Sequence, residues 1–171
     1  MNKPYDVMMR TIYDGEPADW LDYLCVPVPD AAPLQVLDSN VSTIGAEVDK
    51  AVLVGGPEPF IVHTEFVSGR KRDLPEVAFW YNTLLSQKYQ VPVWSVIVLL
   101  RPAADGPELT GVLEKSFPGR GQSLLFRYEV IRIWLEPPEK LLRAGLAVLP
   151  LAPVSNVAPE QKARCGRWPS V

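Results

Sequence analysis

The chain has 171 residues, of which 47% are hydrophobic and 22% charged, a balance that is typical of a globular domain and argues against disorder. Seventeen Lys and Arg residues against 20 Asp and Glu give a net charge of −3, which argues against a protein that coats nucleic acid through its overall charge. No uninterrupted apolar run reaches the roughly 20 residues of a spanning helix, and the N-terminal segment lacks the layout of a signal peptide. We therefore expect a cytoplasmic protein with no membrane partner.

Two cysteines, Cys25 and Cys165, lie far apart in the chain and form no CxxC pair. Zinc sites and redox motifs usually need closely spaced cysteines, so neither is predicted here. We expect both residues to be free thiols.

The first part of the chain predicts two helices and then strands. Apolar residues at helical spacing indicate helices over 5–13 and 17–24, the second of which begins at Pro17, a residue suited to a first turn. Runs rich in β-branched and aromatic residues predict strands over 34–38, 46–54 and 59–67. The sequence GGPEP joins the last two strands, which is typical of an antiparallel hairpin.

The clearest helix signal lies between residues 73 and 89. Asp73 and Glu76 have the spacing of a capping box, and Pro75 suits the first turn. The stripe that should pack on the sheet consists of Val77, Trp80, Tyr81, Leu84, Leu85 and Lys88. We expect Trp80 and Tyr81 to lie in the core and not to stack on nucleic-acid bases.

The remaining elements complete an α/β pattern. A continuous apolar run predicts a buried strand over 93–100, two further runs indicate a second hairpin over 111–117 and 123–134, and a short helix follows over 137–145. The pattern ends near Pro150. We predict a single α/β domain over residues 1–150, with a mixed sheet of about five strands, and a loosely structured tail over 151–171.

The hairpin formed by 46–54 and 59–67 carries the residues with the most chemical promise. Asp49 lies on the same face of its strand as Ala51, and His63, Glu65 and Val67 share one face of the next strand. A turn near Gly56 and Pro57 would bring the carboxylates of Asp49 and Glu65 together across the hairpin, whereas a slip of one residue would separate them. Paired carboxylates are suited to Mg²⁺, but isolated acids in strands are also common on solvated surfaces.

Two neighbouring features have both a functional and a structural interpretation. His63, the single histidine, is either a hydrogen-bonded residue of the fold or a support for a metal ligand. Arg70, Lys71 and Arg72 directly follow the strand and form either a solvated loop or a clamp for phosphate.

Long tracts of the sequence resemble the Rpn-like, transposase-associated branch of the PD-(D/E)XK nuclease superfamily. The tracts that carry the resemblance include FIVHTEFVSG, YNTLLSQKYQVPVWSVIVLLRPAADGPELTG and FRYEVIRIW, and the similarity extends over roughly residues 4 to 160. The resemblance implies a restriction-endonuclease-like α/β/α core that holds Mg²⁺ or Mn²⁺ at the hairpin and cleaves DNA. It also implies that Asp49 and Glu65 are the metal ligands, with His63 and Asp6 in supporting positions.

The chain departs from this family at Val67, where the superfamily has lysine and this branch has glutamine. Valine supplies neither a charge nor an amide dipole to the reacting phosphate, and the loss of one such group typically costs about 10²- to 10³-fold in rate. Side chains that could replace it lie on the following loop and helix: Arg70, Lys71, Asn82 and Gln87.

These observations predict a Mg²⁺-dependent DNA endonuclease whose catalysis is weakened at Val67. The alternative is an inactive nuclease fold that serves as a scaffold for binding DNA or a protein partner. The sequence leaves the oligomeric state open, a homodimer included.

Overall fold

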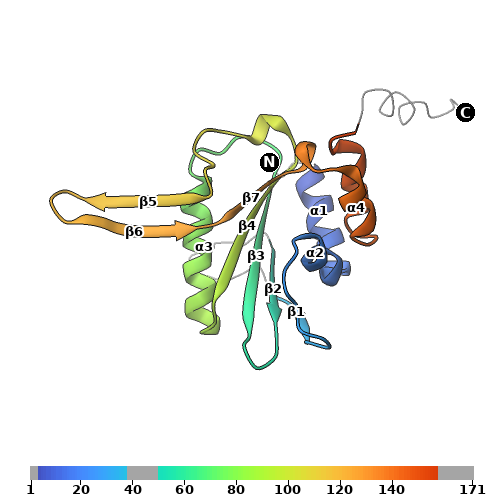
Figure 1. Ribbon diagram of the computed structural model, residues 1–171, viewed down its shortest axis with the longest axis horizontal. Helices are drawn as coiled ribbons and strands as arrows, with labels where there is room; N and C mark the ends of the chain where they lie inside the picture. The colour runs from blue at the N-terminus through green and yellow to red at the C-terminus, as the bar shows by residue number, and fades with distance from the viewer. Residues whose placement is uncertain (1–3, 38–49, 158–171) are drawn as a thin grey trace, which may run out of the picture.

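The computed structural model describes residues 4–37 and 50–157, which form a mixed α/β structure (Figure 1). Its helices are α1 (Pro4–Gly15), α2 (Pro17–Tyr23), α3 (Leu74–Tyr89) and α4 (Pro138–Arg143). Its strands are β1 (Leu34–Val36), β2 (Lys50–Val54), β3 (Phe60–Val67), β4 (Val93–Leu99), β5 (Val112–Phe117), β6 (Gly121–Arg127) and β7 (Glu129–Arg132). Three short 3₁₀ segments occupy Pro102–Ala104, Ile133–Leu135 and Leu149–Val154.

Five strands form the main sheet in the order β1-β2-β3-β4-β7. β1 pairs with β2 and β2 with β3 in the antiparallel sense, whereas β4 is parallel to β3 and β7 is parallel to β4. The helix α3 connects the parallel strands β3 and β4, because such strands need a crossover. The predicted α/β class and the mixed sheet of about five strands are therefore confirmed.

Helices cover both faces of this sheet (Figure 1). One face packs against α1, α2 and α4 in a large core that contains Tyr13, Trp20 and Phe66. The other face packs against α3 in two smaller clusters, one around Val67 and one around Leu85. Residues 95–100 are buried throughout, as expected for a strand covered on both faces.

The second predicted hairpin is present, but its second strand ends at Arg127 and does not reach residue 134 as predicted. β5 and β6 pair with each other in a separate two-stranded ribbon and not with the main sheet. The run after β6 breaks at Tyr128, whose backbone N–H donates to the Gly111 carbonyl over 3.0 Å. The chain then continues as β7 in the main sheet, so the predicted segment 123–134 contains strands of two different sheets.

The buried face of α3 differs from the predicted stripe. Its fully buried residues are Leu74, Pro75, Ala78 and Leu85, whereas Trp80 is 50% exposed. The prediction that Trp80 belongs to the core is therefore wrong, because α3 packs on the sheet along a different stripe, through Leu74, Ala78 and Leu85. Asp73 precedes α3 as predicted, but its side chain makes no capping hydrogen bond.

Packing continues past Pro150. Leu151 and Ser155 are buried, and the backbone N–H of Asn156 donates to the Glu136 carbonyl over 3.0 Å. Within the described part of the chain, no helix has both the length and the apolar character needed to cross a membrane.

Candidate functional site

The central strand β3 carries an apolar run interrupted by two ionisable residues, His63 and Glu65. Both side chains lie on the face that α3 covers, because residues two apart point to the same side of a strand. His63 is 0% exposed and Glu65 only 3%. A histidine and a carboxylate at such depth need specific partners, since burying an unpaired charge is costly.

The two side chains contact each other directly. His63 Nε2 lies 3.0 Å from Glu65 Oε1, and His63 Nδ1 lies 3.2 Å from Ser95 Oγ. Ser95 reaches His63 because β4 is parallel to β3 in a register that pairs these two residues. The edge of the Tyr81 ring approaches the imidazole, with ring centroids 5.8 Å apart.

Asn82 on α3 extends this chain of hydrogen bonds. Its side-chain amide donates to Ser95 Oγ over 3.0 Å and to the Val93 carbonyl over 2.8 Å. Asn82 thus donates to Ser95 Oγ, which bonds with His63 Nδ1, while His63 Nε2 bonds with Glu65 Oε1, so each ring nitrogen has one partner. The network thereby fixes the orientation of the imidazole ring and of the Glu65 carboxyl group.

The neighbouring cation on β2 is paired elsewhere. Lys50 Nζ donates to Asp14 Oδ1 over 2.7 Å, on the opposite face of the sheet. Among the described residues, His63 is the one side chain recorded as hydrogen-bonded to Glu65. A buried carboxyl group with few protein partners is suited to binding a cation, because the cation would offset the cost of burying its charge.

Val67 follows Glu65 on the same face and is 2% exposed. It belongs to an apolar cluster with Leu74, Ala78, Ile97 and Leu99. The position that carries a polar residue in the resembling family is therefore filled by a packed core residue in this chain.

The basic loop after β3 is partly neutralised. Arg70 donates to both carboxylate oxygens of Glu108, over 3.3 Å from Nε and 3.2 Å from an Nη atom. A hydrogen bond from its own backbone amide, followed by that from Arg70, lowers the pKa of Glu108. Lys71 and Arg72 are exposed, so of the three predicted clamp residues these two point most freely to solvent.

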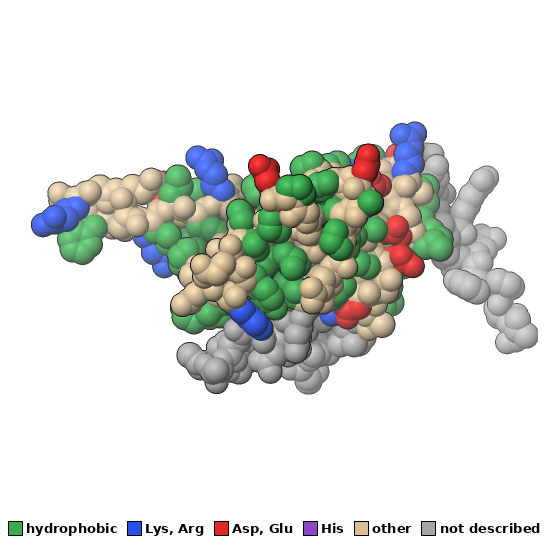
Figure 2. All heavy atoms as spheres, turned by 90° about the horizontal axis from the view of Figure 1, so that it is seen from below, with side chains coloured by type: hydrophobic (Ala, Val, Ile, Leu, Met, Phe, Trp, Pro, Cys, Tyr) green, Lys and Arg blue, Asp and Glu red, His purple; other side chains and the backbone are tan. Residues whose placement is uncertain are grey.

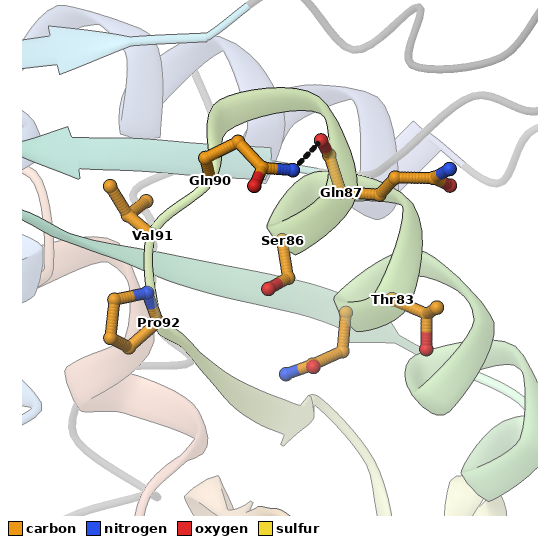
Figure 3. A pocket seen from close by; sticks show the side chains of 7 residues that line it. Thr83, Ser86, Gln87, Gln90, Val91 and Pro92 are labelled. Atoms are coloured by element: carbon orange, nitrogen blue, oxygen red, sulfur yellow. Dashed lines mark hydrogen bonds between the residues drawn. The ribbon is translucent and has the colours of Figure 1, made fainter.

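Gln87 lies apart from the hydrogen-bonded network. With Asn82, it lines a hollow of about 670 Å³ at the C-terminal end of α3. Figure 3 shows the rest of the lining: Thr83, Ser86, Gln90, Val91 and Pro92. The Gln90 side-chain amide donates to the Gln87 carbonyl over 2.7 Å across this hollow. Asn82 is thus the one predicted replacement amide that joins the network, and it acts through Ser95.

Two predicted acids cannot be placed. Asp49 and the side chain of Asp6 lie outside the part of the chain that the structure describes. The hairpin register is confirmed up to the pair Lys50 and Thr64, one residue before the predicted pair of Asp49 with Glu65. Among the described residues no group of three or more His, Cys, Asp or Glu side chains could hold a metal ion.

Ser95 is the residue of this network that the sequence analysis missed. It lies within the apolar run VWSVIVLL, and it is 1% exposed. A lone hydroxyl in an otherwise apolar buried strand must find a hydrogen-bond partner, which was the available signal.

Comparison of the chain with family models, with curated proteins and with solved structures found no match in any of the three.

Proposed function

We propose that the chain is a Mg²⁺-dependent DNA endonuclease of the PD-(D/E)XK type, related to the Rpn-like branch, with Glu65 as a metal ligand. The observation that carries the proposal is the buried Glu65 carboxylate, held by His63 on the central strand. The α/β/α layering and the hairpin of β2 and β3 are the arrangement that the sequence resemblance implies.

The donor set fits a hard cation in part. Glu65 supplies a carboxylate oxygen, the ligand type that Mg²⁺ prefers. The proposal also requires the β2–β3 register to continue by one residue, so that Asp49 faces Glu65 across the hairpin. Mg²⁺ held by these two carboxylates would make a bound water more acidic and offset charge on the phosphate.

The chain's own residues have supporting roles in this proposal. A hydrogen bond from His63 Nε2 to Glu65 Oε1 would leave Oε2 as the oxygen for the metal, while Asn82 and Ser95 hold the imidazole in the orientation that places Nε2 against Glu65. Such partners commonly orient metal ligands. Lys71 and Arg72 would contact phosphate, whereas Arg70 would first have to leave Glu108.

The test combines metal binding with plasmid nicking. Titration calorimetry with Mn²⁺ should show one site in the starting protein and at least a tenfold loss of affinity in Glu65→Gln and in Asp49→Asn. Glutamine can still accept the hydrogen bond from His63, so Glu65→Gln removes charge while preserving the shape of the site. Glu58→Gln, an exposed acid in the β2–β3 turn, is the matched control and should leave affinity unchanged.

Nicking then reports on Val67. In Mg²⁺ or Mn²⁺ the starting protein should nick slowly, and Val67→Gln should increase the rate by up to about 10²-fold if the new amide reaches the phosphate. Adding Glu65→Gln to that variant should abolish the gain. Equal Mn²⁺ binding by all variants would contradict the proposal, whatever the nicking result.

A second candidate is favoured by the burial of Val67. A side chain packed among Leu74, Ala78, Ile97 and Leu99 leaves no polar group at the third motif position. In this alternative the protein is an inactive scaffold that binds DNA or a protein partner. Mn²⁺ binding with no nicking in any variant would support it over the active enzyme.

A further inference from the structure

The ribbon formed by β5 and β6, residues 112–127, projects from the domain as an arm (Figure 1). Its root is anchored, because Leu113 and Phe126 are buried and the rings of Phe126 and Phe79 lie 5.4 Å apart. Every residue from 114 to 123 is exposed. An isolated two-stranded ribbon is marginally stable in water, so an exposed arm of this length indicates a functional role.

The charge of the arm is opposite to that of the protein. It carries Lys115, Arg120 and Arg127 against a single acid, Glu114, in a chain of net charge −3. Lys115 lies 3.6 Å from Glu76, with both side chains about half exposed. Neither Arg120 nor Arg127 has an ion-pair partner in the ranges that the structure describes, 4–37 and 50–157.

The tip adds an apolar group to these cations. Phe117 is 59% exposed and precedes the turn that leads to Arg120, whose backbone N–H donates to the Phe117 carbonyl over 3.0 Å. Gly119 and Gly121 have φ values of 72° and 79°, so this tight turn depends on glycine. Figure 2 shows basic side chains along the arm and a hydrophobic side chain beside the basic group at its tip.

From these features we propose that the β5–β6 arm binds duplex DNA by entering a groove. A two-stranded ribbon fits a groove about 12 Å wide, and β5 with six residues reaches about 20 Å. Arg120 and Arg127 contact phosphates, and Phe117 makes an apolar contact with a thymine methyl group in the major groove. The choice of DNA as the partner rests on the proposed function, but the arm lies on different elements from the Glu65 site.

The test is fluorescence anisotropy of a labelled 25-base-pair duplex in EDTA, so that no cleavage contributes. Arg120→Ala with Arg127→Ala should weaken binding roughly 50-fold at 0.1 M salt and reduce the slope of log K against log salt by about 2. The control is Arg143→Ala with Lys88→Ala, which removes two exposed charges outside the arm. It should change the DNA affinity and the salt slope less. Phe117→Ser should weaken binding by about tenfold while leaving the salt slope unchanged.

Several results would overturn the arm proposal. One is an equal loss of DNA affinity in the two double variants. Another is the absence of DNA binding by the starting protein at 0.05 M salt. A third is a dimer that Phe117→Ser dissociates while the DNA affinity stays unchanged. Circular dichroism should show the same fold for all variants, since the changed side chains are exposed. If DNA binding survives Glu65→Gln and no nicking of DNA is seen, the arm proposal holds and the proposed endonuclease function is contradicted.

Discussion

On the α1 face of β3, Val62, Thr64 and Phe66 lie in a core of aromatic rings, whereas on the α3 face His63 and Glu65 lie in a chain of hydrogen bonds. The Phe66 ring centroid is 5.1 Å from that of Trp20 and 5.8 Å from that of Tyr13. The two faces thus alternate residue by residue along one strand.

The difference shows how a single strand can serve two purposes. The aromatic face gains its stability from buried apolar area and holds the strand in place. The polar face contributes less, because ion pairs and hydrogen bonds gained in the interior are largely offset by the loss of hydration. Packing on the aromatic face therefore holds β3 in place, and with it the polar groups on the opposite face.

The largest effect is expected on the aromatic face. Phe66→Ala should lower the free energy of unfolding by about 3–5 kcal/mol, since it leaves a cavity beside Trp20 and Tyr13. Urea denaturation followed by circular dichroism measures this change. Trp80→Ala, at a 50% exposed site, is the control and should cost less than about 1 kcal/mol. Equal losses would contradict the assignment of the core to this face.

On the polar face, His63→Ala should cost about 3 kcal/mol, because it leaves the Glu65 carboxylate buried without its partner. The same denaturation experiment applies. Replacing both residues with apolar ones of similar size, His63→Leu with Glu65→Met, should recover most of the loss. A double variant as unstable as the single one would show that the pair itself supplies stability.

A third test uses alkaline pH. Burial raises the pKa of Tyr13 to about 12, while its hydrogen bond to Thr64 acts in the opposite direction. The unfolded state loses this proton near pH 10, so stability that is present below pH 10 is lost as the pH rises toward 12, by roughly 2–3 kcal/mol in all. Tyr13→Phe should flatten this decline in urea titrations between pH 9 and 11.5. An unchanged slope would contradict the effect of burial.

The smallest effect is expected at Thr64, whose Oγ1 lies 3.2 Å from the Tyr13 hydroxyl. Thr64→Val should cost about 1 kcal/mol, because it leaves that hydroxyl buried without a partner. In a protein that already carries Tyr13→Phe, the further change Thr64→Val should cost almost nothing. A double-mutant cycle of unfolding free energies measures this difference. Additive costs would mean that the two hydroxyls do not interact.

Much of the fold could be predicted because local patterns decided it. The GGPEP turn indicated the hairpin of β2 and β3, and a largely apolar run identified β4. The buried side of α3 could not be predicted from apolar spacing alone. Trp80 matched one apolar stripe, whereas the helix packs on the sheet along another, through Leu74, Ala78 and Leu85.

The candidate site was predictable along β3 and less so across strands. His63 and Glu65 share a face by the two-residue period, which any strand provides. Ser95 joins them only because β4 lies parallel to β3 in a given register, and Asn82 only because α3 then crosses above it. Contacts of this kind depend on the tertiary arrangement, which no local pattern in the sequence specifies.

The position of β3 in the sheet has a consequence for hydrogen exchange. It is the middle of five strands, hydrogen-bonded on one side to β2 and on the other to β4. We expect its amide protons to exchange with solvent only when the whole domain opens, and those of the exposed arm to exchange through local fraying. We therefore expect His63 and Glu65 to lie on one of the last segments to open, so that their hydrogen bond persists for as long as the protein stays folded.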